Sequence, residues 1–517
     1  MPVIDRDEAH FAQASRQMIQ TGNYFQIRFQ DRTRFQKPPG INWLQAISVK
    51  LFSNAELNSI WPYRLPSLIG ALISVLLTYF FARRFINDTA ACLASGLLVC
   101  TLLLVVEAHM AVIDTSLLSS VLIMQGALWV IYQEAMEKRQ AHWGWALCFW
   151  LAMAYGLVLK GVTPLVGLLS VVTLGLTERR IDWLRGLHIV SGFLLFSLLS
   201  LSWVLLVNHA EHSNYLMQMI HKDLLPKLRG GHESHGKPPL FHLVILPLTF
   251  WPASLFLWQG GVYAFRNRHS QLVKFLLAWI LPTWIFFELM PTKLPQYVLP
   301  TFPAIALLCA LAITKSDKTE MPGKWLGLLQ ILWAVLSVGL ALALASLPYL
   351  LMGQWTGTGI ILLVEITLLT FAAVYFARRG LYQRASRTVM LLALISYPLI
   401  FTSLLPQLKP LWLTANLAKL VAKDKISNQK PLLVVGFDEP SLVFHLNTKQ
   451  VQFVNAPTAK QIIQTDPSRI AVIKAADFET WQNEPVDLAI LARSKGFNYS
   501  KGKWVELFIV GRNNGEN

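Results

Sequence analysis

The chain has 517 residues, of which 54% are hydrophobic and only 14% are charged, a balance incompatible with a surface that faces water throughout. The composition indicates an integral membrane protein and excludes a soluble enzyme fold for most of the chain. The net charge of +16 does not indicate a nucleic-acid partner, because the basic residues recur in small clusters between apolar runs. The four cysteines lie within apolar runs, without the spacing of a metal site or a disulfide framework.

Apolar runs up to residue 406 predict an all-α polytopic membrane domain, because each run is long enough to cross a hydrocarbon core of about 30 Å as a helix. Basic residues fall in every second connector, which predicts that these connectors are cytoplasmic and that both chain ends lie outside. We place twelve helices at 62–83, 88–106, 112–133, 143–158, 162–177, 186–207, 240–261, 272–290, 296–314, 325–350, 357–378 and 387–406.

The regions before and after the predicted helices differ from them in composition. Residues 1–61 form a polar, aromatic juxtamembrane segment, in which Asp7 to Gln20 predict an amphipathic helix along the outer membrane surface. No apolar segment precedes it, so we expect a further helix upstream. Residues 407–517 predict a small α/β domain outside the membrane, with strands at KPLLVVGF and KWVELFIVGR and a helix at TAKQIIQT.

Ionisable residues on the outer side of this topology are informative, because charges at a membrane boundary are costly unless they have a role. Lys160 and Lys293 are the basic residues of the short outer loops, and snorkelling alone is a weaker explanation for them than function. The other candidates are Asp5, Asp7, Glu8, His10, Lys37, Arg64, Glu107, His109, Asp114, Glu288 and, in the outer loop 208–239, Arg229, Glu233 and His235.

Three of the acidic positions, Asp7, Glu8 and Asp114, have a structural alternative. Asp5 and Glu8 fit a capping pattern, and acidic residues favour the first turn of a helix, so Asp7 and Glu8 are consistent with a helix start. Asp114 follows a short outer turn and fits the N-cap of the helix at 112–133 equally well. The sequence leaves capping and catalysis open at these positions.

The outer lysines occur beside prolines, in KPPG at 37–40, GKPP at 236–239 and KLPQYVLP at 293–300. Proline gives rigid, non-helical backbone that holds a lysine head group against an anion. Several cations facing one or two carboxylates suit the departure of a phosphate: the cations stabilise the leaving group, and a carboxylate orients or deprotonates the attacking group.

Six segments together resemble the polyprenyl-phosphate-sugar glycosyltransferases of the GT-C class, in particular the aminoarabinose (lipid A) transferase group of the protein O-mannosyltransferase superfamily. The match extends in consistent order over residues 5–310. The resemblance implies thirteen transmembrane helices, and the predicted twelve with an outer start correspond to that pattern without its first helix. The segments are DEAHFAQASRQMIQTGNYF, RFQKPPGINWLQ, MAVIDTSLL, LVLKGVTPLV, RGGHESHGKPPLFHL and TKLPQYVLPTFPAIAL.

The resemblance also implies roles for individual acidic residues. The family's catalytic acid falls on Asp7, the acid that follows it on Glu8, and the second acidic position on Asp114. His10 replaces an arginine of the family pattern. Gln36 stands where aminoarabinose transferases often have a glutamate linked to metal binding, so the resemblance leaves a divalent metal in doubt.

Basic and loop residues are implied in the same way. Lys37, Lys160 and Lys293 match lysines expected to contact the lipid phosphate, with Arg229 as a further candidate. Glu233 and His235 fall in the family's mobile outer loop, and Tyr297 completes the K-L-P-x-Y motif.

The activity expected is therefore transfer of a sugar from an undecaprenyl-phosphate carrier to a periplasmic acceptor, such as lipid A or another envelope glycan, in a bacterial inner membrane. The sequence specifies neither the sugar nor the acceptor. The alternative is a flippase or transporter of a polyprenyl-linked or anionic substrate. The unusual charges lie at one face rather than at the midplane, and no internal repeat is found, which favours the enzyme.

Overall fold

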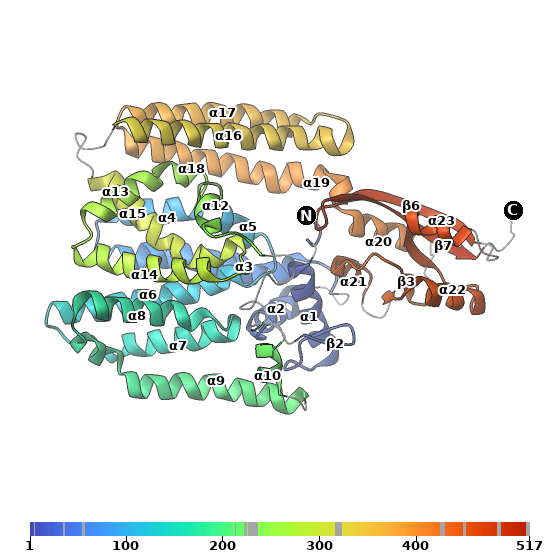
Figure 1. Cartoon of the computed structure of the whole chain (residues 1–517), viewed down its shortest axis with the longest axis horizontal. Helices are drawn as coiled ribbons and strands as arrows, with labels where there is room; N and C mark the ends of the chain where they lie inside the picture. Colours follow the sequence, from blue (N-terminus) through green and yellow to red (C-terminus); the bar gives the residue numbers. More distant parts are fainter. Residues whose placement is uncertain are drawn as a thin grey trace.

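The computed structural model describes residues 1–4, 6–34, 37–53, 57–211, 214–221, 225, 236–315, 323–423, 430–447, 451–482 and 488–512. The molecule is an elongated bundle of roughly parallel helices with a small sheet attached at one end (Figure 1). The N-terminus lies beside this sheet, and the N-terminal helices lie at the same end of the bundle. Two segments far apart in sequence therefore cover one end of the membrane helices.

Each of the twelve predicted membrane segments corresponds to a helix or to a pair of helices separated by a break. Among the described residues, eight helices are long and apolar enough to cross a membrane, or up to ten if each of two bent pairs is one span. The elements are α3 (Trp61–Ala82), α4 (Asp88–Val99), α5 (Leu102–Ala108), α6 (Asp114–Met136), α7 (Trp143–Leu159), α8 (Thr163–Glu178), α9 (Ile189–Glu211), α12 (Phe241–Thr249), η4 (Ala253–Phe256), α13 (Leu257–Arg266), α14 (Gln271–Leu289), η5 (Pro295–Thr301), α15 (Phe302–Lys315), α16 (Gly323–Met352), α17 (Gly357–Arg378) and α18 (Tyr382–Pro398).

The two breaks were not predicted from hydropathy. Helices α4 and α5 meet at 63°, and α12 meets the segment from Ala253 to Arg266 at 113°. The breaks contact one another: the Leu102 amide donates to the carbonyl of Trp251 at 2.8 Å. The hydroxyl of Tyr397 lies 2.7 Å from the Cys100 carbonyl and 3.1 Å from the Trp251 carbonyl. Backbone groups exposed by the breaks are therefore satisfied inside the bundle, as a membrane interior requires.

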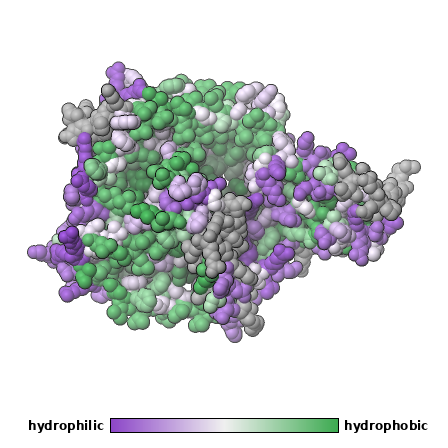
Figure 2. All heavy atoms as spheres, viewed as in Figure 1, coloured by the Kyte–Doolittle hydropathy of each residue, from purple (hydrophilic) through white to green (hydrophobic). Residues whose placement is uncertain are grey.

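The membrane helices divide into enclosed and peripheral ones. In the most apolar window of α6, and of the span from Pro295 to Lys315, 94% of the residues are buried. The corresponding figure is 17% for α9 and 28% for both α16 and α17. Large apolar side chains cover the sides of the bundle, and hydrophilic residues gather at its end away from the sheet (Figure 2). This distribution is that of a protein whose sides contact lipid.

The N-terminal residues form helix α1 (Asp7–Thr21), the short paired strands β1 (Arg28–Phe29) and β2 (Arg32–Thr33), and helix α2 (Gly40–Phe52). Helix α1 ends at Thr21, and its C-cap Gly22 adopts a left-handed conformation. The apolar face of α1 packs against other protein segments: Phe11 and Ile41 share one buried cluster, and Ala9 and Phe444 share another. The position of α1 along the membrane surface stays a prediction. Helix α2 was not predicted.

The C-terminal residues form a mixed five-stranded sheet in the order β4-β3-β5-β7-β6. The predicted strands and helix appear as β3, β7 and α22. Two apolar clusters, around Leu432 and Leu433, cover the two faces of the sheet. The elements are α20 (Leu413–Lys423), β3 (Leu432–Val434), α21 (Pro440–Leu446), β4 (Val451–Phe453), α22 (Ala456–Thr465), β5 (Ala471–Lys474), α23 (Ala475–Gln482), β6 (Leu488–Asn498) and β7 (Lys503–Arg512).

The N-terminal helices and the C-terminal sheet are joined by specific contacts. The buried Arg16 guanidinium donates to the Phe444 carbonyl at 2.9 Å, and Gln30 donates to the Val451 carbonyl at 2.8 Å. The ring of Tyr63, at the start of α3, packs edge-on against Phe444. These contacts fix α1 over the end of the bundle.

Candidate functional site

An ion pair between Asp114 and Lys160 is the centre of the candidate site. The ammonium nitrogen of Lys160 lies 2.8 Å from a carboxylate oxygen of Asp114 and 5.0 Å from the centre of the Tyr297 ring. The two charged side chains are only 12% and 10% exposed. Asp114 begins α6, Lys160 follows the end of α7, and Tyr297 lies in η5, so three separate segments meet here.

The capping interpretation of Asp114 is wrong. Helix α6 has Ile113 at its N-cap position, and no side-chain hydrogen bond caps it. The Asp114 carboxylate instead pairs with Lys160, 46 residues later in the chain. A buried charge pair of this kind requires close packing of the elements that carry it.

Two glycines allow the approach of these elements. A Cβ at Gly70 in α3 would lie 2.6 Å from the Ser116 amide nitrogen, beside the start of α6. A Cβ at Gly40 in α2 would lie 2.6 Å from the Val158 carbonyl, two residues before Lys160. The glycine of the KPPG motif therefore brings the segment with Lys37 against the end of α7.

Both carboxylate oxygens of Glu8 accept hydrogen bonds from other parts of the protein. Its carboxylate forms a two-pronged pair with Arg64, at 2.8 and 2.9 Å, and accepts the amides of Ile4 and Ala111 at 2.6 and 2.7 Å. Arg64 also donates to the carbonyls of Met1 and Pro2. Because both oxygens of Glu8 are occupied, the carboxylate joins α1 to α3 and to the turn before α6.

Asp7 differs from its neighbour. It is exposed at the start of α1, and the helix has no side-chain cap bond at its N-cap, Arg6. Its charge interacts with Glu107 at the end of α5, and Glu107 interacts in turn with Asp114 and Lys160. Asp7 therefore belongs to the same electrostatic cluster as the ion pair.

Lys293 is buried, with 3% exposure, beside two loops that meet at this end of the bundle. Its ammonium donates to the carbonyls of Met290 at 2.7 Å and Lys237 at 3.2 Å. Gly236 and Thr292 form a β-bridge, so the GKPP and KLPQY motifs pair with each other. The sequence indicated both motifs but not their pairing.

A second contact holds the same loops. The ring of His242 lies between the Glu288 carboxylate, at 3.2 Å, and the Leu294 carbonyl, at 3.1 Å. Lys37 lies elsewhere, at a small cavity between α1 and α2 that Arg34 and Asn42 also line. The structure therefore brings Asp114, Lys160 and Tyr297 into direct contact and leaves Lys37 and Lys293 in neighbouring loops.

Several predicted residues fall outside the described part of the chain: Arg229, Glu233, His235, Gln36 and Asp5. Among the described residues, no group of three or more His, Cys, Asp or Glu side chains is placed to hold a metal ion.

Glu107 is among the outer ionisable residues that the sequence indicates, but no role was predicted for it. Glu107 is 4% exposed, and one of its carboxylate oxygens is enclosed without a hydrogen-bond partner among the described residues. The signal was an acid within the apolar run LLLVVEAHM, since an acid in such a run is costly. Its neighbour His109 stacks on Phe401, with ring centres 4.0 Å apart, and burial lowers the pKa of this histidine.

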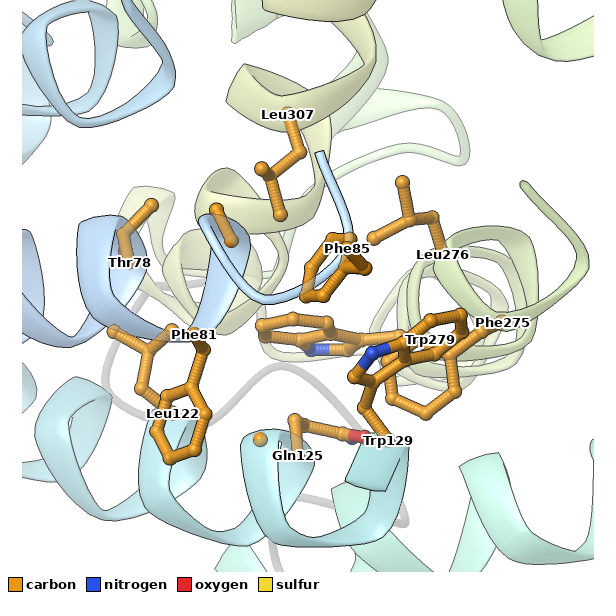
Figure 3. A pocket seen from close by; sticks show the side chains of 12 residues that line it. Thr78, Phe81, Phe85, Leu122, Gln125, Trp129, Phe275, Leu276, Trp279 and Leu307 are labelled. Atoms are coloured by element: carbon orange, nitrogen blue, oxygen red, sulfur yellow. The ribbon is translucent and has the colours of Figure 1, made fainter. Parts of the chain in front are cut away.

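A cavity at the other end of the bundle does not fit the same chemistry. It is lined by aromatic side chains, including Phe81, Trp129 and Trp279 (Figure 3). Its volume is about 20 Å³, which leaves room for about one water molecule. It is too small for a sugar, and its lining includes no charged side chain.

Comparison with known proteins identifies what this arrangement is similar to. Residues 36–205 match the family described as dolichyl-phosphate-mannose-protein mannosyltransferase. An undecaprenyl phosphate-alpha-4-amino-4-deoxy-L-arabinose arabinosyl transferase of Pseudomonas paraeruginosa is 30% identical over 351 residues, which cover 66% of this chain and 61% of that protein. A transferase with the same description from Pseudomonas fluorescens is 28% identical over 346 residues, covering 66% and 59%. The chain thus spans less than two thirds of the length of these relatives.

Solved structures agree on the fold. ArnT from Cupriavidus metallidurans, bound to undecaprenyl phosphate, aligns with a TM-score of 0.75 at 19% identity, over 98% of this chain and 94% of that one. An oligosaccharyltransferase of Archaeoglobus fulgidus aligns with a TM-score of 0.51 at 12% identity, over 92% and 65%. The resemblance to aminoarabinose transferases is confirmed, and the chain has the fold of the Cupriavidus ArnT.

Proposed function

We propose that the protein transfers a sugar from an undecaprenyl-phosphate carrier to an acceptor such as lipid A. The observation that carries this proposal is the buried Asp114–Lys160 pair against Tyr297, with Asp7 and Lys293 at the same end of the bundle. Relatives that share this region are described as undecaprenyl-phosphate aminoarabinose transferases. We extend that donor class to this chain and take a 4-amino pentose as the sugar.

The lysines hold the phosphate of the donor. Lys160 is kept charged and oriented by Asp114, and Lys293 is oriented by two main-chain carbonyls, each leaving part of the ammonium for an anion. Lys37 and Arg229 complete the set of cations. Preorganised cations stabilise a leaving phosphate without reorganising during the reaction, and one such contact contributes about 3 kcal/mol.

Asp7 acts on the acceptor. An acceptor oxygen bonds to the anomeric carbon from the face opposite the phosphate, the bond from that carbon to the phosphate oxygen breaks, and the polyprenyl phosphate leaves with the electron pair. The sugar is thereby inverted at this carbon. A phosphate acceptor is already an anion and needs only alignment by Asp7, whereas a hydroxyl acceptor gives its proton to the carboxylate.

The other two acids act through neighbours. Asp114 orients Lys160, and Glu8 orients Arg64 and the turn that leads to Asp114. This revises the catalytic role expected for Glu8, because neither of its oxygens is left for a substrate. Glu233, His235 and Tyr297 line the substrate, with Tyr297 packed against the Lys160 ammonium.

The site faces the periplasm of a bacterial inner membrane. Exposed basic residues such as Arg83, Arg139, Arg180 and Arg378 follow helices at the end away from the site, which supports a cytoplasmic location for that end. All twelve predicted segments then cross the membrane, α7 and α8 as short helices. The chain divides into a juxtamembrane segment (1–61), a membrane domain (62–406) and a periplasmic α/β domain (407–517).

The proposal is tested with purified protein in proteoliposomes that contain a synthetic undecaprenyl-phosphate aminoarabinose and lipid A. Mass spectrometry follows glycosylated lipid A and free undecaprenyl phosphate. We expect both products in equal amounts from the wild type and neither from protein-free vesicles. Movement of the intact carrier across the bilayer, without release of its sugar, would instead support a flippase.

A further inference from the structure

Glu107 is a buried acid of the site that the proposed mechanism does not use. It ends α5, seven residues before Asp114, and its side chain lies among the charges of Asp7, Asp114 and Lys160. One carboxylate oxygen is enclosed and has no hydrogen-bond partner within the described part of the chain. A buried carboxyl group without a partner costs several kcal/mol, about 3 or more, unless a ligand or a proton supplies what is missing.

Within the described residues, the lysine whose charge acts on Glu107 already has a carboxylate partner. Asp114 already occupies the Lys160 ammonium at 2.8 Å, and Arg64 is bound on both prongs by Glu8. Burial lowers the pKa of His109, so this neighbour supplies no positive charge near neutral pH. In the described part of the chain, Glu107 therefore interacts electrostatically with two other acids, Asp7 and Asp114, and with one cation, Lys160. A cation bound beside Glu107 would supply the missing partner.

We propose that Glu107 binds the ammonium group of the transferred sugar and thereby selects an amino sugar over its neutral counterpart. The inference rests on the proposed function and adds a specificity-determining residue to it. In a six-membered ring, an amine on carbon 4 lies across from the anomeric carbon. The lysines then hold the phosphate at one side of the ring, and Glu107 holds the amine at the other.

The chemistry predicts strong selection. A carboxylate and an ammonium form a charge-assisted hydrogen bond, about twice as strong as a neutral one. A sugar with a hydroxyl in place of the amine leaves Glu107 buried and unpaired, and sites with such unpaired polar groups discriminate by large factors. Glu107→Gln removes the charge but keeps the size of the side chain, so it removes the preference rather than the site.

The test compares kcat/KM for two synthetic donors, an undecaprenyl phosphate that carries 4-amino-4-deoxy-arabinose and one that carries arabinose. We expect the wild type to prefer the amino sugar and Glu107→Gln to lower that preference at least tenfold. The control is Glu365→Gln. Glu365 is also a membrane-helix glutamate, but it lies in α17, outside the site, and accepts a hydrogen bond from Ser396 at 2.7 Å. Its preference should equal that of the wild type.

The outcomes separate this inference from the proposed function. A wild type that transfers neither sugar contradicts the proposed function. A wild type that transfers both equally well, or an unchanged preference in Glu107→Gln, contradicts only the role of Glu107. If the preference is unchanged but the pH profile of kcat/KM shifts, Glu107 binds or transfers a proton instead, and the proposal is likewise overturned. If Glu107→Gln does not fold, Glu107→Asp keeps the charge and should keep the preference, and a folded Glu107→Asp without preference is equally decisive.

Discussion

Among the described residues, the bundle has a lysine–carboxylate pair at each end, and the two pairs differ in how completely they are bonded. At the end away from the candidate site, Lys274 lies 2.9 Å from Glu178, and the Tyr132 hydroxyl donates to the same carboxylate at 2.8 Å. At the candidate site, Lys160 lies 2.8 Å from Asp114, but Glu107 stands beside the pair without a partner of its own. The groups of the first pair are bonded to one another. The second pair has a neighbouring carboxyl group that is left to bind a ligand.

Replacing the lysine of each pair tests whether this difference in bonding affects transfer. Lys160→Met should lower transfer by at least a hundredfold, since one preorganised contact to a leaving anion contributes about 3 kcal/mol. Lys274→Met should leave transfer within about threefold of the wild type, because Tyr132 still bonds Glu178 and the pair is far from the chemistry. Single-turnover rates per folded protein measure both. Equal losses in the two variants would show that the difference in bonding has no functional meaning.

A second prediction concerns the leaving phosphate. Lys293→Ala should lower turnover by about a hundredfold, and Lys293→Arg by less, if charge dominates over shape. Turnover with the lipid-linked donor at matched protein levels is the measurement. Wild-type turnover in the alanine variant would remove Lys293 from the site.

A variant of Glu8 tests whether this residue stabilises the fold or takes part in catalysis. Glu8→Gln should lower the thermal unfolding midpoint, because the buried Arg64 loses its carboxylate partner, at a cost of about 3 kcal/mol. Transfer per folded protein should fall only a few-fold, since Glu8 does not contact the substrate. A large loss of transfer at unchanged stability would restore the catalytic role.

The smallest expected effect is a pH dependence at the junction of α1 with the C-terminal sheet. Burial, with the nearby Arg34, lowers the pKa of His10 from its usual 6.5 to about 3. Burial, with Lys419 and Arg16, lowers the pKa of His445 to about 4. Both histidines are therefore neutral in the folded protein but take up protons on unfolding below pH 6.5.

The stability they contribute is present above pH 6.5 and is lost as the pH falls towards 4. Between pH 7 and 5.5 we expect a loss of about 1 kcal/mol for each histidine. Thermal unfolding in detergent measures it, and a His10→Gln, His445→Gln double variant should show a weaker dependence. An identical pH dependence in the double variant would contradict this assignment.

Much of the fold could be predicted because hydropathy reports burial in lipid directly. Each predicted membrane segment coincides with a helix or a bent pair, and the strands at KPLLVVGF and KWVELFIVGR follow from short apolar runs. The breaks after Cys100 and at Trp251 could not be predicted, because they depend on Tyr397 and on each other for their hydrogen bonds. Helix α2 was missed because its mixed sequence is stabilised by packing against α1 and α3.

The sequence indicated which residue types form the site, but not which of these side chains contact each other. Asp114 and Lys160 were both indicated, but their contact spans 46 residues and depends on the close approach at Gly70 and Gly40. The resemblance gave Asp7 as the catalytic acid, but the residues alone did not show that the adjacent Glu8 is bound to Arg64. Whether Glu107 can bind a ligand depends on which nearby cations are already paired with other carboxylates, and no local sequence pattern contains that information.

The role of Asp7 in the chemistry is tested by measuring glycosyl transfer by Asp7→Asn together with donor binding by the same protein. Asn supports a helix start about as well as Asp, and Asp7 is exposed, so the variant should fold and bind the undecaprenyl-phosphate donor like the wild type. If Asp7 aligns or deprotonates the acceptor, transfer should fall by about two orders of magnitude. Donor binding and transfer both at wild-type levels would contradict the assignment of Asp7 to the chemistry.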